Sequence, residues 1–187
     1  NRVMFPIMDE NGDVIAFGGR VMDDTKPKYI NSPDSQLFSK RTRLYGYPYK
    51  AERRSEAIII CEGYMDYIAL HSAGYQDCAA VLGTALTEEH VRLIASHYKK
   101  VYLSMDSDGA GINAAKKSIG LLKAAGLPVR VLDFRPYKDP DEFLRSNPYG
   151  VDAFHKRVEQ ALPECQFLAR HASDIGELAG ILARQVP

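Results

Sequence analysis

The sequence predicts an α/β protein whose main sheet is mostly parallel. Between residues 57 and 134, short runs rich in β-branched residues alternate with segments of helical periodicity. The links between these segments are short, and glycine or proline residues end the helical patterns. The composition, 45% hydrophobic and 26% charged, is ordinary for a protein that buries a core. Together these observations favour a parallel sheet flanked by helices.

Before this unit, the chain begins with a predicted β-hairpin. Residues 3–8 and 13–19 have strand character, and Asn11-Gly12 is typical of a two-residue turn between them. The following residues, 20–56, show no regular pattern because prolines and glycines interrupt them. We expect the hairpin and this stretch, residues 1–55, to belong to a subdomain of their own.

The positive charge of this subdomain is local. The formal net charge of the chain is zero, yet residues 20–54 hold nine lysines and arginines against four acidic residues. A basic segment beside an acidic remainder indicates a polyanion held next to a metal site. The alternative interpretation is a loop whose charges are simply solvated.

The alternating unit, residues 56–145, contains four predicted strands with helices between them. "AIIIC" at 57–61 is the kind of run that is buried on both faces of a parallel sheet. Apolar stripes mark the helices, and Thr87 is placed to cap the second one. The remaining predicted strands are 78–82, 100–105 and 129–134. After them, residues 146–187 show only helix patterns, which predict a helical appendage.

Five acidic residues follow the first, third and fourth of these strands. Glu62 comes directly after its strand, Asp106 and Asp108 come directly after theirs, and Asp139 and Asp141 follow a few residues later. The carboxyl ends of parallel strands open onto one edge of a sheet, so these side chains are expected to converge there. Crowded carboxylates repel one another, and a hard divalent cation with oxygen ligands relieves that repulsion.

Each acidic segment also has a simpler interpretation. "EGYMD" at 62–66 fits a loop acid followed by a helix-surface acid, and "DSDGAG" at 106–111 fits a turn. "KDPDE" at 138–142 fits a helix start with acids in its first turn. The three segments follow three parallel-type strands in order, which favours the metal-site interpretation over three unrelated turns.

These three segments, in this order, resemble the Toprim domain of topoisomerases, primases and some nucleases. Upstream, "FPIMDENGDVIAFGGRV", "PKYINSP" and "LFSKRTRLYG" resemble the RNA polymerase domain of bacterial DnaG-type primases just before its Toprim domain. The resemblance covers roughly residues 1–170. It implies that residues 1–55 are the C-terminal part of a basic subdomain of mixed α+β structure and that residues 56–145 have a Toprim-type fold.

The resemblance also implies roles for individual residues. Mg²⁺ or Mn²⁺ would be bound by Glu62, Asp106 and Asp108, with the acidic centre completed by Asp139 and Asp141. Contacts to template or nucleotide phosphates would come from basic residues of the first subdomain, namely Arg20, Lys28 and Lys40, with Arg41 and Arg43 along the same path. One position departs from the family pattern, because Ser107 stands where glycine is common.

The function that this resemblance implies is DNA primase activity, a magnesium-dependent nucleotidyl transfer that makes short RNA primers on single-stranded DNA. The implied partners are the template, NTPs, the RNA primer and a replicative helicase bound through a separate C-terminal domain, with no membrane. Zinc is expected only in a separate N-terminal domain, and the location is a cytoplasmic bacterial or phage replisome. This stretch alone is expected to be weakly active or inactive.

Three other functions stay open at this point. A related Toprim chemistry would cleave strands as a nuclease or topoisomerase does. An aspartate-based phosphohydrolase would use Asp106 as a nucleophile. A non-catalytic nucleic-acid-binding module would keep the acids as a structural ion site.

Overall fold

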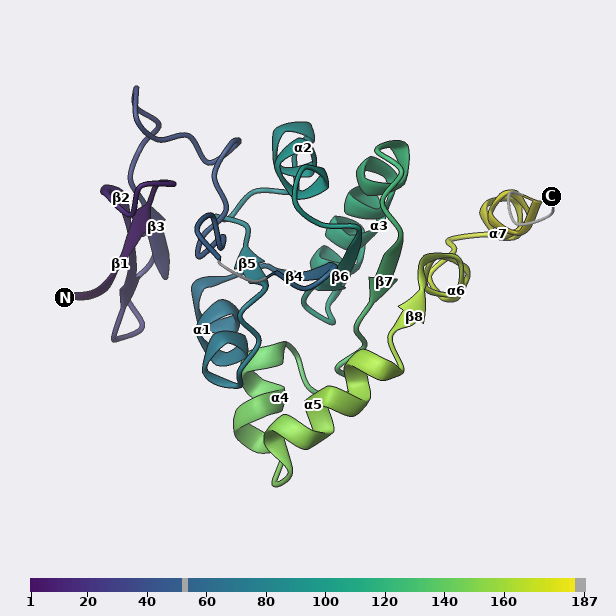
Figure 1. Cartoon of the computed structure of the whole chain (residues 1–187). Helices are drawn as coiled ribbons and strands as arrows, with labels where there is room; N and C mark the ends of the chain where they lie inside the picture. Colours follow the sequence, from purple (N-terminus) through teal and green to yellow (C-terminus); the bar gives the residue numbers. More distant parts are fainter. Residues whose placement is uncertain (52–53, 184–187) are drawn as a thin grey trace.

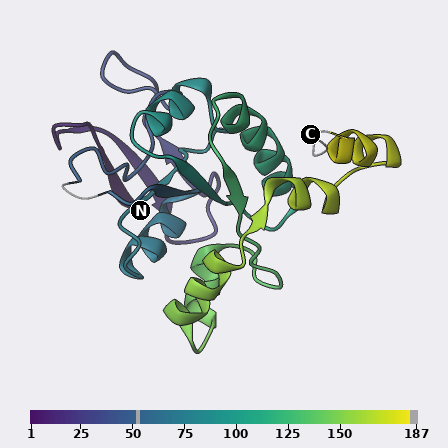
Figure 2. The same cartoon turned by 45° about the vertical axis from the view of Figure 1, so that its right-hand side comes forward.

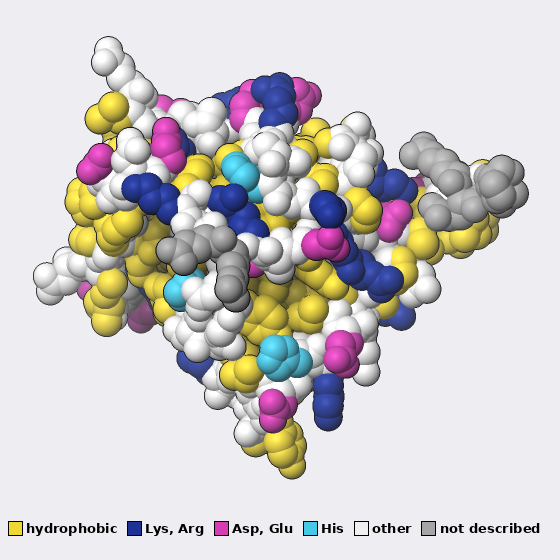
Figure 3. Space-filling model, viewed as in Figure 1, with side chains coloured by type: hydrophobic (Ala, Val, Ile, Leu, Met, Phe, Trp, Pro, Cys, Tyr) yellow, Lys and Arg dark blue, Asp and Glu magenta, His cyan; other side chains and the backbone are white. Residues whose placement is uncertain are grey.

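The computed structural model describes residues 1–51 and 54–183, which form two sheets and seven helices. The larger sheet lies at the centre, and the smaller N-terminal sheet stands apart on one side of it (Figure 1). On the face drawn in Figure 3, acidic and basic side chains are interspersed. Among the described residues, no helix has the length and apolar character needed to cross a membrane.

The small sheet is antiparallel and contains β1 (Arg2–Met8), β2 (Val14–Val21) and β3 (Tyr29–Asn31). The predicted hairpin is confirmed. The prediction that residues 20–56 are irregular throughout missed β3. This strand has only three residues, and its pairing with β2 is a long-range register that no local pattern reveals.

The central sheet has the order β5-β4-β6-β7-β8, and its first four strands are parallel to one another. The predicted α/β class with a mostly parallel sheet is therefore confirmed. The antiparallel edge strand β8 was not predicted, since it has two residues. The strands are β4 (Ala57–Cys61), β5 (Cys78–Ala80), β6 (Lys100–Ser104), β7 (Val129–Val131) and β8 (Leu162–Pro163).

Helices cover both faces of the central sheet, as Figure 1 shows. Alternate residues of β4 divide between two cores: Ile58 and Ile60 face the layer of α2 and α3, whereas Ile59 and Cys61 face α1, α4 and α5. The helices of these two layers are α1 (Tyr64–Ser72), α2 (Glu88–Ala95), α3 (Gly109–Ala124), α4 (Pro140–Ser146) and α5 (Gly150–Glu159).

The last two helices, α6 (Glu164–Arg170) and α7 (Ile175–Ala183), extend away from the central sheet in both cartoon views (Figures 1 and 2). Phe167 of α6 is buried in the same core as α3. An ion pair between Lys116 and Glu177, 2.9 Å long, holds α7 to α3. Helices make up most of residues 146–183, as predicted, although α6 itself was not foreseen; the rest of the predicted appendage, residues 184–187, lies outside the described residues.

Candidate metal and nucleic-acid site

The parallel register brings Glu62 and Asp106 to one edge of the central sheet. Cys61 at the end of β4 pairs with Ser104 at the end of β6, so the next residues of both strands emerge side by side. Glu62 Oε1 accepts a hydrogen bond from the backbone N–H of Asp106 at 3.1 Å. Burial, followed by the negative charge of Asp106, raises the pKa of Glu62. This part of the predicted acidic edge therefore forms as the strand order implies.

Asp66 is a further acid at this edge, one turn along α1 from Glu62. It is 7% exposed, and its Oδ2 accepts a hydrogen bond from the backbone N–H of Gly63 at 3.1 Å. Burial, together with the charges of Asp139 and Asp106, raises the pKa of Asp66 to about 7. A buried carboxylate beside two others is a site where positive charge is favoured.

A lysine already supplies some of that positive charge. Lys138 Nζ lies 2.7 Å from Asp106 Oδ2 and 3.8 Å from Asp139 Oδ2. The pattern "KDPDE" predicts a role for its acids and none for its lysine. The proximity of Lys138 to Asp106 depends on two loops that are about 30 residues apart, so the local sequence held no signal for it.

The other predicted acids are engaged with partners of their own. The Asp108 carboxylate caps α3 by accepting from Gly111 N at 2.9 Å, and Asp141 forms a two-point ion pair with Arg145. Asp139 caps α4 through Glu142 N at 2.8 Å. Within residues 1–51 and 54–183, no three His, Cys, Asp or Glu side chains form a ready-made metal cage. The convergence of all five predicted ligands on one cation remains a prediction.

Two of the predicted basic residues face the acidic edge across a cleft of about 400 Å³. Arg20 on β2 and Lys28 before β3 line this cleft together with Glu62, Asp106 and Lys138. A cleft that brings Arg20 and Lys28 close to a group of carboxylates suits a phosphate ester with a bound cation.

The remaining basic residues lie on a loop that does not line this cleft. Thr87 Oγ1 at the start of α2 donates to the carbonyl of Arg41 at 2.6 Å, and the buried His90 ring contacts the carbonyl of Arg43 at 3.1 Å. The Arg43 side chain forms an ion pair with Glu10. The structure thus fixes the segment of Lys40, Arg41 and Arg43 against α2, apart from Arg20 and Lys28.

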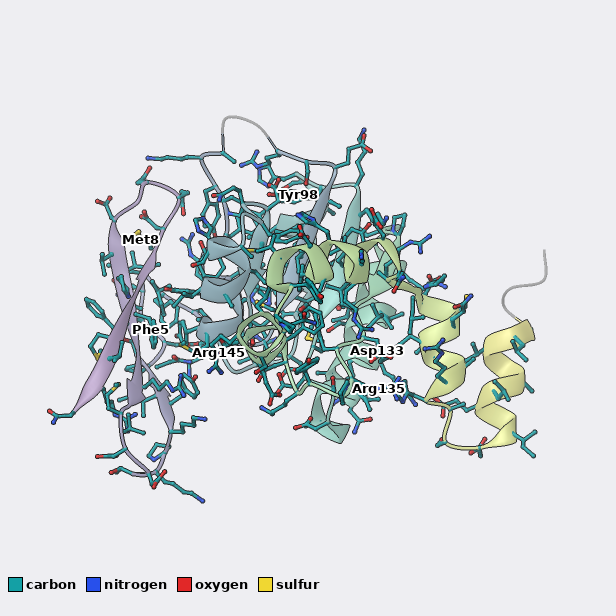
Figure 4. All side chains as sticks on the ribbon, turned by 90° about the horizontal axis from the view of Figure 1, so that it is seen from below. Phe5, Met8, Tyr98, Asp133, Arg135 and Arg145 are labelled. Atoms are coloured by element: carbon teal, nitrogen blue, oxygen red, sulfur yellow. The ribbon has the colours of Figure 1, made fainter. Side chains whose placement is uncertain are left out.

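Several residues of the cleft were not among the predicted site residues. Tyr29 and Asn31 line it from β3, and the Arg20 guanidinium lies 5.6 Å from the centre of the Tyr29 ring. The Tyr64 hydroxyl donates to Asn31 Oδ1 and so joins α1 to the small sheet. In the view of Figure 4, Arg145 of α4 lies between the small sheet and the loop after β7. The available signal in "KYIN" was an aromatic residue, Tyr29, directly after the basic Lys28.

Comparison with known proteins identifies the families that this fold and site match. The family described as DNA primase catalytic core, N-terminal domain, matches residues 1–51, and the Toprim-like family matches residues 59–144. A DNA primase of Clostridium acetobutylicum is 45% identical over 163 residues, which are 87% of this chain and 27% of that protein. A DNA primase of Pseudomonas aeruginosa is 40% identical over 174 residues, covering 89% of this chain and 26% of that protein.

Solved structures agree with these relatives. The E. coli primase catalytic core matches with a TM-score of 0.82 and 36% identity over 92% of this chain and 56% of that chain. A DNA primase domain from Pseudomonas aeruginosa matches with a TM-score of 0.84 and 38% identity over 96% of this chain and 59% of that chain. The chain spans about a quarter of the primases and somewhat over half of the matched structures. The chain belongs to the family of bacterial DnaG-type DNA primases and corresponds to a part of their catalytic core that includes the Toprim domain.

Proposed function

We propose that this chain forms part of a catalytic core that synthesises short RNA primers on single-stranded DNA. The observation that carries this proposal is the cleft in which Arg20 and Lys28 face Glu62 and Asp106. One of the related structures is described as a DnaG primase catalytic domain bound to single-stranded DNA, at a TM-score of 0.82. The relatives found are primases, so strand cleavage and a purely binding role are not favoured.

The donor set at the acidic edge fits a hard divalent cation such as Mg²⁺ or Mn²⁺. All of its groups are carboxylates, and burial together with neighbouring carboxylates raises the pKa of Glu62 and of Asp66, an environment that favours a bound cation. Glu62 and Asp106 would hold the cation, and Asp139, Asp108 and Asp141 would join them by exchanging their present partners. When bound, such an ion activates an attacking hydroxyl and stabilises charge on the leaving phosphates.

The other groups of the cleft position the substrates. Arg20 and Lys28 would bind phosphate oxygens of template or NTP, which gives affinity without sequence preference. Tyr29, 38% exposed and beside Arg20, offers a ring on which a base can stack. Lys40, Arg41 and Arg43 would contact the template farther from the acidic edge. In this arrangement catalysis comes from positioning and electrostatics, with the primer 3′-hydroxyl attacking the NTP α-phosphate and pyrophosphate leaving.

The partners and location implied by the resemblance belong to the same proposal. We expect the protein that contains this chain to use NTPs, extend an RNA primer, cooperate with a replicative helicase and act in the cytoplasm. Zinc would be held by a separate domain, as in the related structure described as containing zinc-binding and RNA polymerase domains.

A primer-synthesis assay tests the proposal. The full-length protein is incubated with single-stranded template, labelled NTPs and Mg²⁺, and short RNA products are expected. Asp106→Asn should abolish synthesis while circular dichroism shows a folded protein. Asp152→Asn is a matched control, because this exposed acid lies on α5 away from the cleft, and it should retain full activity. Strand cutting without RNA synthesis, or normal synthesis by Asp106→Asn, would refute the proposal.

A further inference from the structure

We propose that Lys138 is a built-in counter-ion of the acidic edge. Its ammonium group takes the place of a divalent cation while none is bound, and it transfers to the phosphates of a nucleoside triphosphate when the cation binds. This inference rests on the proposed function, because it assigns a role to Lys138 within the same cleft.

The ammonium group of Lys138 lies among the acids of the cleft. Lys138 Nζ is 2.7 Å from Asp106 and 3.8 Å from Asp139, so it bridges carboxylates from two different loops. Asp106 is also bonded through its backbone to Glu62. The ammonium therefore lies between a carboxylate of the loop after β6 and one at the start of α4, and Glu62 after β4 is bonded to the same loop. It reduces a repulsion that would otherwise separate these loops.

The backbone of Lys138 is held in place by hydrogen bonds, whereas its side chain is free to move. The carbonyl of Lys138 accepts a hydrogen bond from Ser107 N at 2.8 Å, and its own N–H donates to Glu142 Oε2 at 2.6 Å. The backbone is thus fixed between the "DSD" loop and the start of α4. The Lys138 side chain, by contrast, is 58% exposed. The ammonium can leave Asp106 by side-chain rotation alone, without a backbone shift.

Lys138 and a divalent cation would compete for the carboxylate oxygens of Asp106. A cation held by the Asp106 carboxylate would lie beside Asp106 Oδ2, the atom that Lys138 contacts. An ammonium and a divalent ion within about 4 Å repel each other strongly, so only one of them can occupy this point. Lys138 lines the cleft that Arg20 and Lys28 face. A displaced lysine there is well placed to bind phosphate oxygens, for which its ammonium is a suitable point charge.

Two binding measurements on the full chain test this inference. Mn²⁺ binding alone is followed by electron paramagnetic resonance, and binding of a non-hydrolysable ATP analogue is followed by calorimetry in the presence of Mn²⁺. Lys138→Gln should bind Mn²⁺ roughly three- to tenfold more tightly, since a partly exposed competing charge is lost. It should bind the analogue more weakly by a similar factor. Lys138→Arg, which keeps the charge, should restore analogue binding.

A matched control removes the same charge elsewhere. Lys156 is exposed on α5, and Lys156→Gln should leave both affinities unchanged. A lysine with only a structural role would weaken both affinities or neither, whereas the counter-ion role changes them in opposite directions. Equal Mn²⁺ affinity in wild type and Lys138→Gln would overturn this inference alone. Absence of Mn²⁺ binding by wild type, or undiminished binding by Asp106→Asn, would overturn the proposed metal centre as well.

Discussion

Replacement of Asp66 by Asn should remove a large part of the pH dependence of stability in the cation-free protein. Asp66 is 7% exposed, and burial beside Asp139 and Asp106 raises its pKa from the ordinary 3.8 to about 7. Between these pH values the folded protein keeps a proton that the unfolded chain has released. The unfolded state then binds fewer protons, so the free energy of unfolding falls as the pH rises.

The size of the effect follows from the shift. One pKa unit corresponds to about 1.4 kcal/mol, so a shift from 3.8 to about 7 costs the wild type on the order of 4 kcal/mol between pH 4 and pH 8. In Asp66→Asn the side chain is neutral at every pH, and its amide oxygen can still accept from Gly63 N. The variant should therefore lose this slope and be the more stable protein at pH 8.

Urea denaturation in EDTA at pH 4.5, 6 and 8, followed by circular dichroism, measures this slope. Asp152→Asn, which removes an exposed acid on α5, should keep the wild-type slope. Addition of Mg²⁺ at pH 8 should stabilise the wild type, because a bound cation compensates the buried charge. Identical slopes for wild type and Asp66→Asn would show that Asp66 is ionised in the folded protein and would refute the reasoning.

Three further changes test other parts of the site. Gly111→Ala should lower the free energy of unfolding by about 1–3 kcal/mol in urea titrations, because its Cβ would overlap the Asp106 carbonyl. The control Gly120→Ala, in an open position of the same helix, should raise it by about 0.5–1 kcal/mol. Burial lowers the pKa of His90 below 6.5, so at acidic pH the unfolded chain takes up a proton on this residue before the folded protein does. The melting temperature should therefore fall as the pH is lowered below 6.5, and it should fall less in His90→Gln. Affinity for single-stranded DNA, measured by fluorescence anisotropy, falls as salt is added, and the slope of log affinity against log salt concentration should be smaller in magnitude by about one in Lys28→Ala. An unchanged slope would place Lys28 outside the interface.

Periodicity in the sequence was sufficient to predict the central sheet. The run at 57–61 is apolar throughout because both faces of β4 are covered, and this pattern is typical of a parallel strand between helix layers. The short strands β3 and β8 could not be predicted in the same way. Each has two or three residues, and their existence depends on a neighbouring strand that the local sequence does not encode.

The acidic edge was predictable only as far as the backbone determines it. The strand order places Glu62 and Asp106 side by side, and the structure has them joined by a hydrogen bond. The directions of Asp108 and Asp141 depend instead on local competition, because a helix N–H and a neighbouring arginine offer these carboxylates strong partners. The sequence contains the capping signal "DGAG", but it does not tell whether a cap or a cation prevails.

Tyr64 is one of the residues that join the acidic edge to the small sheet, together with Asn31, whose side-chain amide donates to the Leu82 carbonyl. Tyr64 follows Glu62 by two positions, its ring stacks on Phe5 with 4.7 Å between ring centres, and its hydroxyl bonds to Asn31. Gly18 on β2 leaves no room for a side chain against this ring. The residue that begins α1 beside the acids is therefore packed into the small sheet that carries Arg20. Because this contact is direct, the width of the cleft is set by packing between the two sheets rather than by the long connection from β3 to β4.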